Sequence, residues 1–121
     1  MIAHSLALSA LFLISRVEAA EIARVFNVPV EAAWPAAVTV ATEAFLADRI
    51  SHADHRLRLR AGPLRAYSFE ISVREAGAGK TRVELTLRTP TAIPAVRQEA
   101  QRNADRYFTL LRQRLEKPER K

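Results

Sequence analysis

The chain has 121 residues, 49 % of them hydrophobic and 26 % charged, which is the composition of one folded domain and excludes a disordered or fibrous chain. Nineteen Lys and Arg residues against 13 Asp and Glu residues give a formal net charge of +6. The sequence contains no cysteine, which excludes a disulfide framework, a thiolate zinc site, a cysteine nucleophile and a lipid-modified N-terminal cysteine.

The first residues have the layout of a secretory leader. The apolar run from Leu6 to Ile14 is about half as long as a membrane-spanning helix, and Val17 and Ala19 suit a cleavage site just after Ala19. We therefore expect residues 1–19 to be a cleaved leader and the mature protein to be periplasmic or secreted, with no integral membrane segment. A buried N-terminal helix and an uncleaved membrane anchor are the alternatives.

A strand and a helix are predicted next. Residues 22–28 are rich in β-forming side chains and are followed by the breaker Pro29. A helix is expected to begin near Ala32, with Pro35 in its first turn, and to end near Glu43 or Phe45. Helical spacing predicts an apolar face formed by Trp34, Val38 and Ala41.

Three segments then alternate between apolar and polar residues, over residues 55–60, 67–74 and 82–88. This period of two predicts an antiparallel sheet with one apolar face and one solvated face. Gly62-Pro63 and Gly77-Ala78-Gly79 separate the segments and predict turns.

The register of the last two strands can be predicted as well. A slip by one residue would turn every apolar side chain into water, so one pairing is strongly favoured. That pairing sets Val73, Ile71 and Phe69 opposite Val83, Leu85 and Leu87 on the apolar face, and Ser72 and Glu70 opposite Glu84 and Thr86 on the polar face.

A long helix over residues 95–116 completes the domain, followed by a frayed tail over residues 117–121. Its apolar stripe matches the apolar face of the sheet, and no other predicted element offers such a stripe. The fold class is therefore α+β, a single domain over residues 20–116 in the order strand, helix, three antiparallel strands, long helix. The stripe consists of Val96, Ala100, Ala104, Tyr107 or Phe108, Leu111 and Leu115.

Motifs that suggest catalysis or metal binding have simpler explanations. Gly79-Lys80-Thr81 lacks the upstream glycine and the following helix of a phosphate loop, so a hairpin turn is expected. His52 and His55 flank Asp54 in a loop without a further ligand, so we expect no metal and no cofactor. Glu70 and Glu84 share their face with arginines, which predicts salt bridges rather than an acid–base pair. No catalytic residue is predicted, and an enzyme is not expected.

The arginines are a stronger functional signal. A row of them on the polar face of the sheet could meet phosphate groups of an anionic surface, with a merely solvated face as the alternative. Sheets that bind nucleic acid usually expose aromatic side chains, whereas Tyr67 and Phe69 fall on the apolar face, which argues against nucleic acid. The predicted row comprises Arg56, Arg58, Arg60, Arg82 and Arg88.

Two segments resemble helix-grip domains. Residues 26–34 (FNVPVEAAW) resemble their opening, in which a strand ends in a Pro-containing turn and a helix begins with an acidic residue and a Trp. Residues 103–116 (NADRYFTLLRQRLE) are similar to their long closing helix. The START and polyketide-cyclase-like superfamily and several small exported bacterial domains share this opening. The resemblance implies a sheet that grips a long helix and carries over no catalytic residue.

These observations favour a non-enzymatic, exported binding module whose partner is an envelope protein or an anionic envelope surface. The alternative is a small START-like carrier that holds an apolar, lipid-like ligand between sheet and helix. Because only about four strands are expected, we do not expect a large cavity. The carrier would use Trp34, Tyr67 and Phe69 as its ligand-binding residues.

Overall fold

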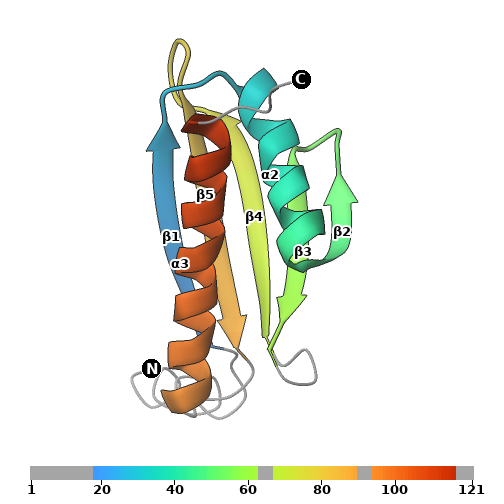
Figure 1. The fold of residues 1–121 in the computed structure, drawn as a ribbon, viewed down its shortest axis with the longest axis vertical. Coiled ribbons are helices and arrows are strands. Elements are labelled where there is room, and N and C mark those ends of the chain that lie inside the picture. The colour runs from blue at the N-terminus through green and yellow to red at the C-terminus, as the bar shows by residue number, and fades with distance from the viewer. Residues whose placement is uncertain (1–17, 63–66, 90–93, 117–121) are drawn as a thin grey trace, which may run out of the picture.

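The computed structural model describes residues 18–62, 67–89 and 94–116. The predicted tail and the predicted leader lie outside these ranges, except for Glu18 and Ala19 at the end of the leader. The described residues form one antiparallel sheet with two helices on one of its faces, as Figure 1 shows.

The sheet has five strands in the spatial order β1-β5-β4-β3-β2. Helix α3 packs on β5, and helix α2 packs on β4 and β2, so the two helices lie side by side on the same face (Figure 1). In chain order the elements are β1 (Glu18–Phe26), α2 (Val30–Ala44), β2 (Leu46–Ser51), β3 (Arg56–Ala61), β4 (Tyr67–Glu75), β5 (Thr81–Thr89) and α3 (Pro94–Glu116).

The α+β class and the long closing helix are confirmed, but the sheet has one more strand than predicted. Strand β2 was missed because its pairing with β3 shifts between Ala47 and Arg49, which interrupts the alternation. Strand β1 covers residues 18–26 rather than 22–28, since it pairs along its whole length with β5 from Glu18↔Thr89 onward. Tertiary pairing thus overrides the weak strand propensity of Glu18, Ala19 and Ala20.

Helix α2 begins two residues earlier than predicted. The Pro29 carbonyl accepts hydrogen bonds from the N–H groups of Ala32 and Ala33, both at 3.0 Å, and these bonds start the helix. Pro35 therefore lies beyond the first turn. The buried face of α2 also differs from the prediction at Val38, which is only partly buried. The buried positions of α2 are Ala33, Trp34, Ala36, Ala37, Val40 and Ala41.

The predicted register of β4 and β5 is confirmed at every pair, from Val73↔Val83 to Phe69↔Leu87. The apolar side chains of β3, β4 and β5 point toward the helices, and all except the partly buried Ala61 are buried. The predicted stripe of α3 covers them, with Ala100, Ala104, Tyr107, Phe108 and Leu111 buried. Helix α2 shares this task, because the Tyr107 hydroxyl on α3 donates a hydrogen bond of 3.0 Å to the carbonyl of Ala37 on α2.

Gly62, at the end of β3, predicts a strong stability effect. Its φ is +84°, which L side chains rarely adopt, and a Cβ there would clash with Cε2 of the buried Tyr67 ring. We expect Gly62→Ala to destabilise the fold by about 2–3 kcal/mol, combining backbone strain with a steric clash. Urea unfolding of the two proteins measures this difference.

Gly77 provides a matched control. It also has a positive φ, +125°, but nothing lies within 4 Å of the position of its Cβ. Gly77→Ala should therefore carry the backbone cost alone. Equal losses of stability in the two variants would contradict the predicted clash between a Cβ at position 62 and the Tyr67 ring.

Candidate functional site

All five predicted arginines lie on the face of the sheet that points away from the helices, which we call the outer face. Strand alternation places them there, since their neighbours in β3 and β5 point into the core. The cross-strand pairs Arg58↔Glu70 and Ser68↔Arg88 are part of the same polar surface. The prediction that the outer face combines arginines with carboxylates is confirmed, and Arg74 lies there as expected, opposite Arg82.

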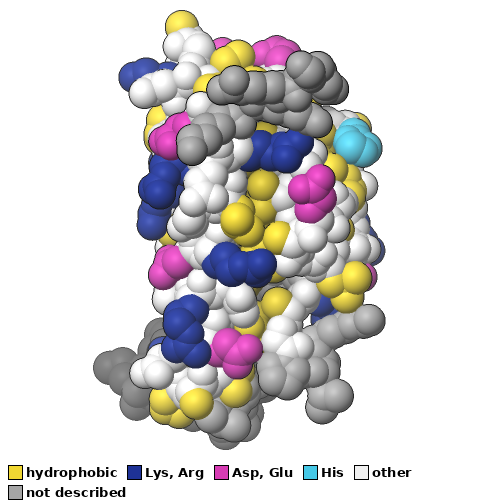
Figure 2. Space-filling model, in the orientation of Figure 1, with side chains coloured by type: hydrophobic (Ala, Val, Ile, Leu, Met, Phe, Trp, Pro, Cys, Tyr) yellow, Lys and Arg dark blue, Asp and Glu magenta, His cyan; other side chains and the backbone are white. Residues whose placement is uncertain are grey.

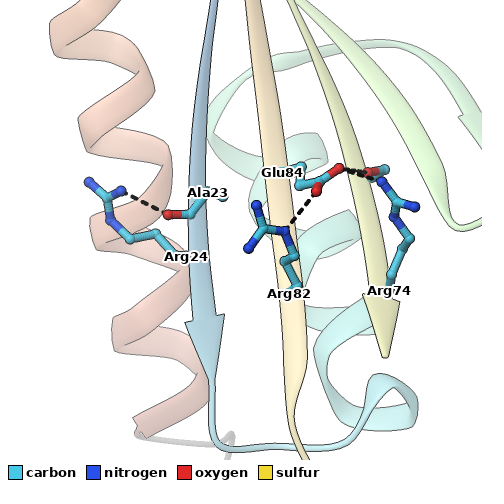
Figure 3. Close-up of polar contacts among 6 residues, drawn as sticks. Ala23, Arg24, Arg74, Arg82 and Glu84 are labelled. Atoms are coloured by element: carbon cyan, nitrogen blue, oxygen red, sulfur yellow. Dashed lines mark hydrogen bonds and ion pairs between the residues drawn. The ribbon is translucent and has the colours of Figure 1, made fainter. Parts of the chain in front are cut away.

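Glu84 holds two arginines on this face (Figure 3). One carboxylate oxygen accepts a hydrogen bond of 2.7 Å from Arg82, and the other accepts one of 2.6 Å from Arg74. Arg74 and Arg82 are directly opposite each other across β4 and β5, so Glu84 also relieves the repulsion between two like charges. The hydrogen bonds from Arg82 and then Arg74 lower the pKa of Glu84 from 4.5 to about 2.

Asp48 has the same role at the other side of the sheet. One of its carboxylate oxygens accepts hydrogen bonds from Arg58 at 3.0 Å and from Arg60 at 3.3 Å. The bond from Arg60, supported by Arg58, lowers the pKa of Asp48 below its usual value. A third carboxylate, Glu70, lies 3.4 Å from Arg88. Five arginines thus share three carboxylates. Two more carboxylates, Glu21 and Asp54, line the same face.

Two further arginines of the outer face, Arg49 and Arg56, have no ion pair within residues 18–62, 67–89 and 94–116. Arg49 is directly opposite Arg58, whose charge Asp48 already compensates. Arg49 was not predicted, because β2 was not predicted. The only signal for Arg49 in the sequence is the pair Asp48-Arg49. A regular strand would have a single outer-face residue at this point, whereas this strand has two.

A hollow of about 550 Å³ on the outer face contains both of these arginines. It spans all five strands, and its lining includes the side chains of Ser51 and Ser72. Its charged lining residues are Arg49, Arg56, Arg58, Arg74, Glu21, Asp54, Glu70 and Glu84. Ser51 donates to Asp54 at 3.2 Å, and Ser72 donates to Glu84 at 3.4 Å. The hollow is therefore polar and lined by charged groups.

Two large hydrophobic side chains are exposed in the described part of the chain, and both lie on the outer face. Val25 is 54 % exposed and is opposite Arg82 at the β1 edge. Leu46 is 45 % exposed and is opposite Arg60 at the β2 edge. The arginines are thus flanked on both sides by an apolar side chain, a combination found on proteins that contact lipid headgroups.

The lowered pKa of Glu84 predicts how stability depends on pH. The folded state favours the ionised form, so this carboxylate stabilises the fold above its usual pKa of 4.5, and its contribution is lost as the pH falls toward 2. We expect the urea midpoint of the wild type to fall over this range, and Glu84→Gln to remove the Glu84 part of that fall. Glu21→Gln, which removes the same charge from a carboxylate that has no ion pair among the described residues, is the control. A wild-type slope that survives in Glu84→Gln would contradict the prediction.

The three residues predicted to bind an apolar ligand are all buried, at exposures of 7 % for Trp34, 1 % for Tyr67 and 0 % for Phe69. The rings of Tyr67 and Phe69 lie 5.8 Å apart. The Tyr67 hydroxyl accepts a hydrogen bond of 2.6 Å from Asn103 on α3, and burial raises the pKa of Tyr67. These two residues therefore act as packing between the sheet and α3.

Trp34 has different neighbours. Its indole N–H donates to Nδ1 of His52 at 3.1 Å, and its ring lies 5.1 Å from that of His55. Both histidines come from the turn between β2 and β3, and His55 has a φ of +55°. Trp34 thus connects this turn to α2 through a hydrogen bond and a ring contact. The histidines were expected to be loop residues; they are, but their contact with Trp34 was not foreseen.

The space between the sheet and the helices is filled by side chains. Phe45 at the end of α2 contacts Phe69 and Tyr107, with ring centroids 6.3 Å and 5.8 Å away. Tyr107 and Leu111 on α3 are 0 % exposed, like Phe69 below them, so no water-sized space adjoins these three side chains. The core of this domain therefore offers no room for a ligand at Phe69.

The helix side of the molecule differs from the outer face. Figure 2 shows basic and acidic side chains scattered over it, with an apolar strip between the helices. The groove between α2 and the end of α3 is lined by Ala32, Pro35, Ala36, Arg114 and Leu115. The helix side thus also carries charged side chains, but it has an apolar strip between them.

Two weaker motifs are resolved by the structure. Gly79-Lys80-Thr81 is the predicted hairpin turn, closed by the Lys80 N–H on the Gly77 carbonyl at 3.0 Å. Among the described residues, no group of His, Cys, Asp and Glu side chains is arranged to hold a metal ion. Neither described helix is long and apolar enough to cross a membrane.

The arrangement of an antiparallel sheet around a long C-terminal helix, preceded by a strand and a shorter helix, is the helix-grip fold. The resemblance seen in residues 26–34 and 103–116 is therefore confirmed at the level of the fold. No family model matches the sequence. No curated protein matches it either.

Three solved structures illustrate the likeness. Ara h 8.0201 is 14 % identical with a TM-score of 0.62, over 83 % of this chain and 98 % of that chain. The di-domain ARO/CYC cyclase BexL of the BE-7585A biosynthetic pathway is 12 % identical with a TM-score of 0.63, over 82 % of this chain but only 46 % of that chain. TTHA0849 from Thermus thermophilus is 16 % identical with a TM-score of 0.51, over 81 % of this chain and 97 % of that chain.

Proposed function

We propose that this protein is a non-enzymatic binding module whose outer face binds an anionic lipid surface of the cell envelope. The observation that carries the proposal is the composition of that face. Seven arginines stand against five carboxylates on it, and Arg49 and Arg56 have no ion pair among the described residues. Two exposed apolar side chains, Val25 and Leu46, lie at opposite edges. Basic side chains attract anionic headgroups, and apolar side chains enter the boundary between headgroups and acyl chains.

The same face argues against nucleic acid as the partner. No aromatic side chain is exposed on it within the described strands, because Tyr67 and Phe69 are buried on the opposite face. Proteins that bind single strands or RNA loops usually stack bases on exposed aromatic rings. Binding to nucleic acid would have to rest on charge alone.

Sedimentation with vesicles tests the proposal. The full chain should bind vesicles that contain phosphatidylglycerol and should not bind vesicles of phosphatidylcholine alone. Binding should weaken strongly as salt rises, since exposed charges more than about 10 Å apart are screened at 0.1 M ionic strength. Equal binding to both vesicles, or binding to a DNA duplex but to neither vesicle, would refute the lipid surface as the partner.

Export is part of the same proposal. Cleavage after Ala19 would remove the first two residues of β1, Glu18 and Ala19, and leave seven of its nine residues paired with β5. The mass of the protein from a periplasmic fraction should therefore correspond to a chain that begins at Ala20. An intact Met1 in the cytosol would contradict export and would direct the search for an anionic surface to the inside of the cell.

The carrier remains the second candidate, because the helix-grip fold is shared with a protein described as an ARO/CYC cyclase. Trp34 is the only tryptophan and reports on the interior of the domain. If an apolar ligand entered between sheet and helices, Trp34 fluorescence should change on titration with fatty acids or polyketide-like aromatics. An unchanged signal across such a panel is the expected result.

A further inference from the structure

The arginines of the outer face fall into two groups that differ in their partners. Arg58, Arg60, Arg74, Arg82 and Arg88 are each within 3.4 Å of a carboxylate, so salt bridges explain their presence. Salt bridges do not explain Arg49 and Arg56. These two line the same hollow, at its β2–β3 side.

The position of Arg49 carries an electrostatic cost. It is directly opposite Arg58, and like charges directly opposite each other destabilise a sheet. At the equivalent pair, Arg74 and Arg82, Glu84 bridges both guanidinium groups. Asp48 instead bridges Arg58 to Arg60 on the same strand, and Arg49 is left outside this group.

Arg56 lies between two serines, whose hydroxyls donate to Asp54 and Glu84. It is opposite Ser51 on β2 and opposite Ser72 on β4, so a hydroxyl side chain lies on each side of it. Arg49 is two residues from Ser51 along β2, which makes Arg49 and Arg56 diagonal neighbours across the two strands. Long side chains at diagonal positions, with Cβ atoms roughly 7 Å apart, can reach a common point.

We propose that this part of the hollow is a discrete binding site for one phosphate group, held by Arg49 and Arg56. Guanidinium groups bind phosphate through paired, charge-assisted hydrogen bonds. A bound phosphate would also neutralise the repulsion between Arg49 and Arg58. The site rests on the proposed function and refines it, because it names the chemical group that the outer face recognises.

The negative charge of Asp54 should repel a bound phosphate. A variant without this charge should therefore bind phosphate more tightly, whereas the arginine variants should bind it more weakly. The Asp54 carboxylate lines the hollow and accepts the hydrogen bond of Ser51. Asp54→Asn removes one negative charge near the ligand. It should tighten phosphate binding about fivefold.

The experiment is a titration of the full chain with inorganic phosphate, followed by the NMR signals of backbone amides and arginine Nε–H groups. We expect saturable shifts concentrated in residues 49–58 and at Ser72. Arg49→Gln/Arg56→Gln should weaken binding roughly 25-fold, about fivefold for each arginine. The matched control is Arg82→Gln/Arg88→Gln, which removes the same charge from the same face and should cost less than about threefold, since these residues act from beyond the site.

Equal losses in the two double variants, or shifts spread over all arginines, would overturn the discrete site. The vesicle experiment separates this outcome from failure of the proposed function. If phosphatidylglycerol vesicles bind but both double variants lose the same affinity, the surface stands and the site is wrong. If phosphate binds at residues 49–58 and the vesicles do not, the site stands for a free phosphate compound and the lipid surface is wrong.

Discussion

Phe69→Ala is expected to destabilise the domain by about 3–5 kcal/mol, the usual cost of removing a fully buried phenylalanine ring. Phe69 is 0 % exposed and contacts Tyr67 on its own strand and Phe45 at the end of α2. Because domains of this size are stable by only about 5–15 kcal/mol, the melting temperature should fall on the order of 15 °C. Val25→Ala, which truncates a side chain that is 54 % exposed, is the control and should change stability by less than about 0.5 kcal/mol.

The same variant tests whether the interior can hold a ligand. In the wild type the space around Phe69 is filled, so a small apolar compound such as benzene should not raise the melting temperature. In Phe69→Ala the lost ring leaves an apolar cavity, and benzene should raise the melting temperature if the cavity stays open. A wild type that is already stabilised by benzene, or a Phe69→Ala variant that loses almost no stability, would favour the carrier over the binding surface.

Strands with an uninterrupted alternation could be predicted from the sequence to the level of individual pairs. Val73↔Val83 and Ile71↔Leu85 follow from the requirement that one face stay dry. The same requirement places Arg82 and Arg88 on the outer face. A local pattern suffices here because the alternation along each strand determines which side chains face the core. That in turn determines how the strand pairs with its neighbour.

Strand β2 could not be predicted in this way. Its bulge between Ala47 and Arg49 breaks the period of two, and Leu46 is exposed although it is hydrophobic. Arg49 was missed as a consequence, although it belongs to the proposed phosphate site. The contact of Trp34 with His52 was also beyond reach, since it joins residues 18 positions apart through a turn with a positive φ at His55.

The filled interior also depends on a property that residue patterns do not contain. Tyr67 and Phe69 were correctly placed on the apolar face. However, an apolar face looks the same in the sequence whether it lines a cavity or packs into a filled core. The choice between them depends on how closely α2 and α3 approach the sheet. Small residues such as Ala33, Ala37 and Ala104, all 0 % exposed, permit this close approach.

Arg49→Glu/Arg56→Glu is expected to abolish most binding to phosphatidylglycerol vesicles. Each basic residue near a charged bilayer contributes about 1 kcal/mol, and replacing two of them by acids doubles the effect to about 4 kcal/mol, or roughly 1000-fold in affinity. The variant should still fold, because the carboxylate introduced at position 49 would lie opposite the positive charge of Arg58, where the wild type has two arginines. Circular dichroism and the urea midpoint check this before the vesicles are added.

The control for this experiment is Arg97→Glu/Arg102→Glu on α3. Both arginines are exposed on the helix side of the molecule, and both double variants lower the formal net charge from +6 to +2, since each substitution removes two units. A protein attracted by its net charge alone would lose the same affinity in the two variants. A protein that binds through the outer face should retain most of its affinity when only α3 is changed, because the helices are turned away from the surface in that orientation. The ratio of the two affinities therefore measures the orientation of the bound molecule, independently of how strongly the wild type binds.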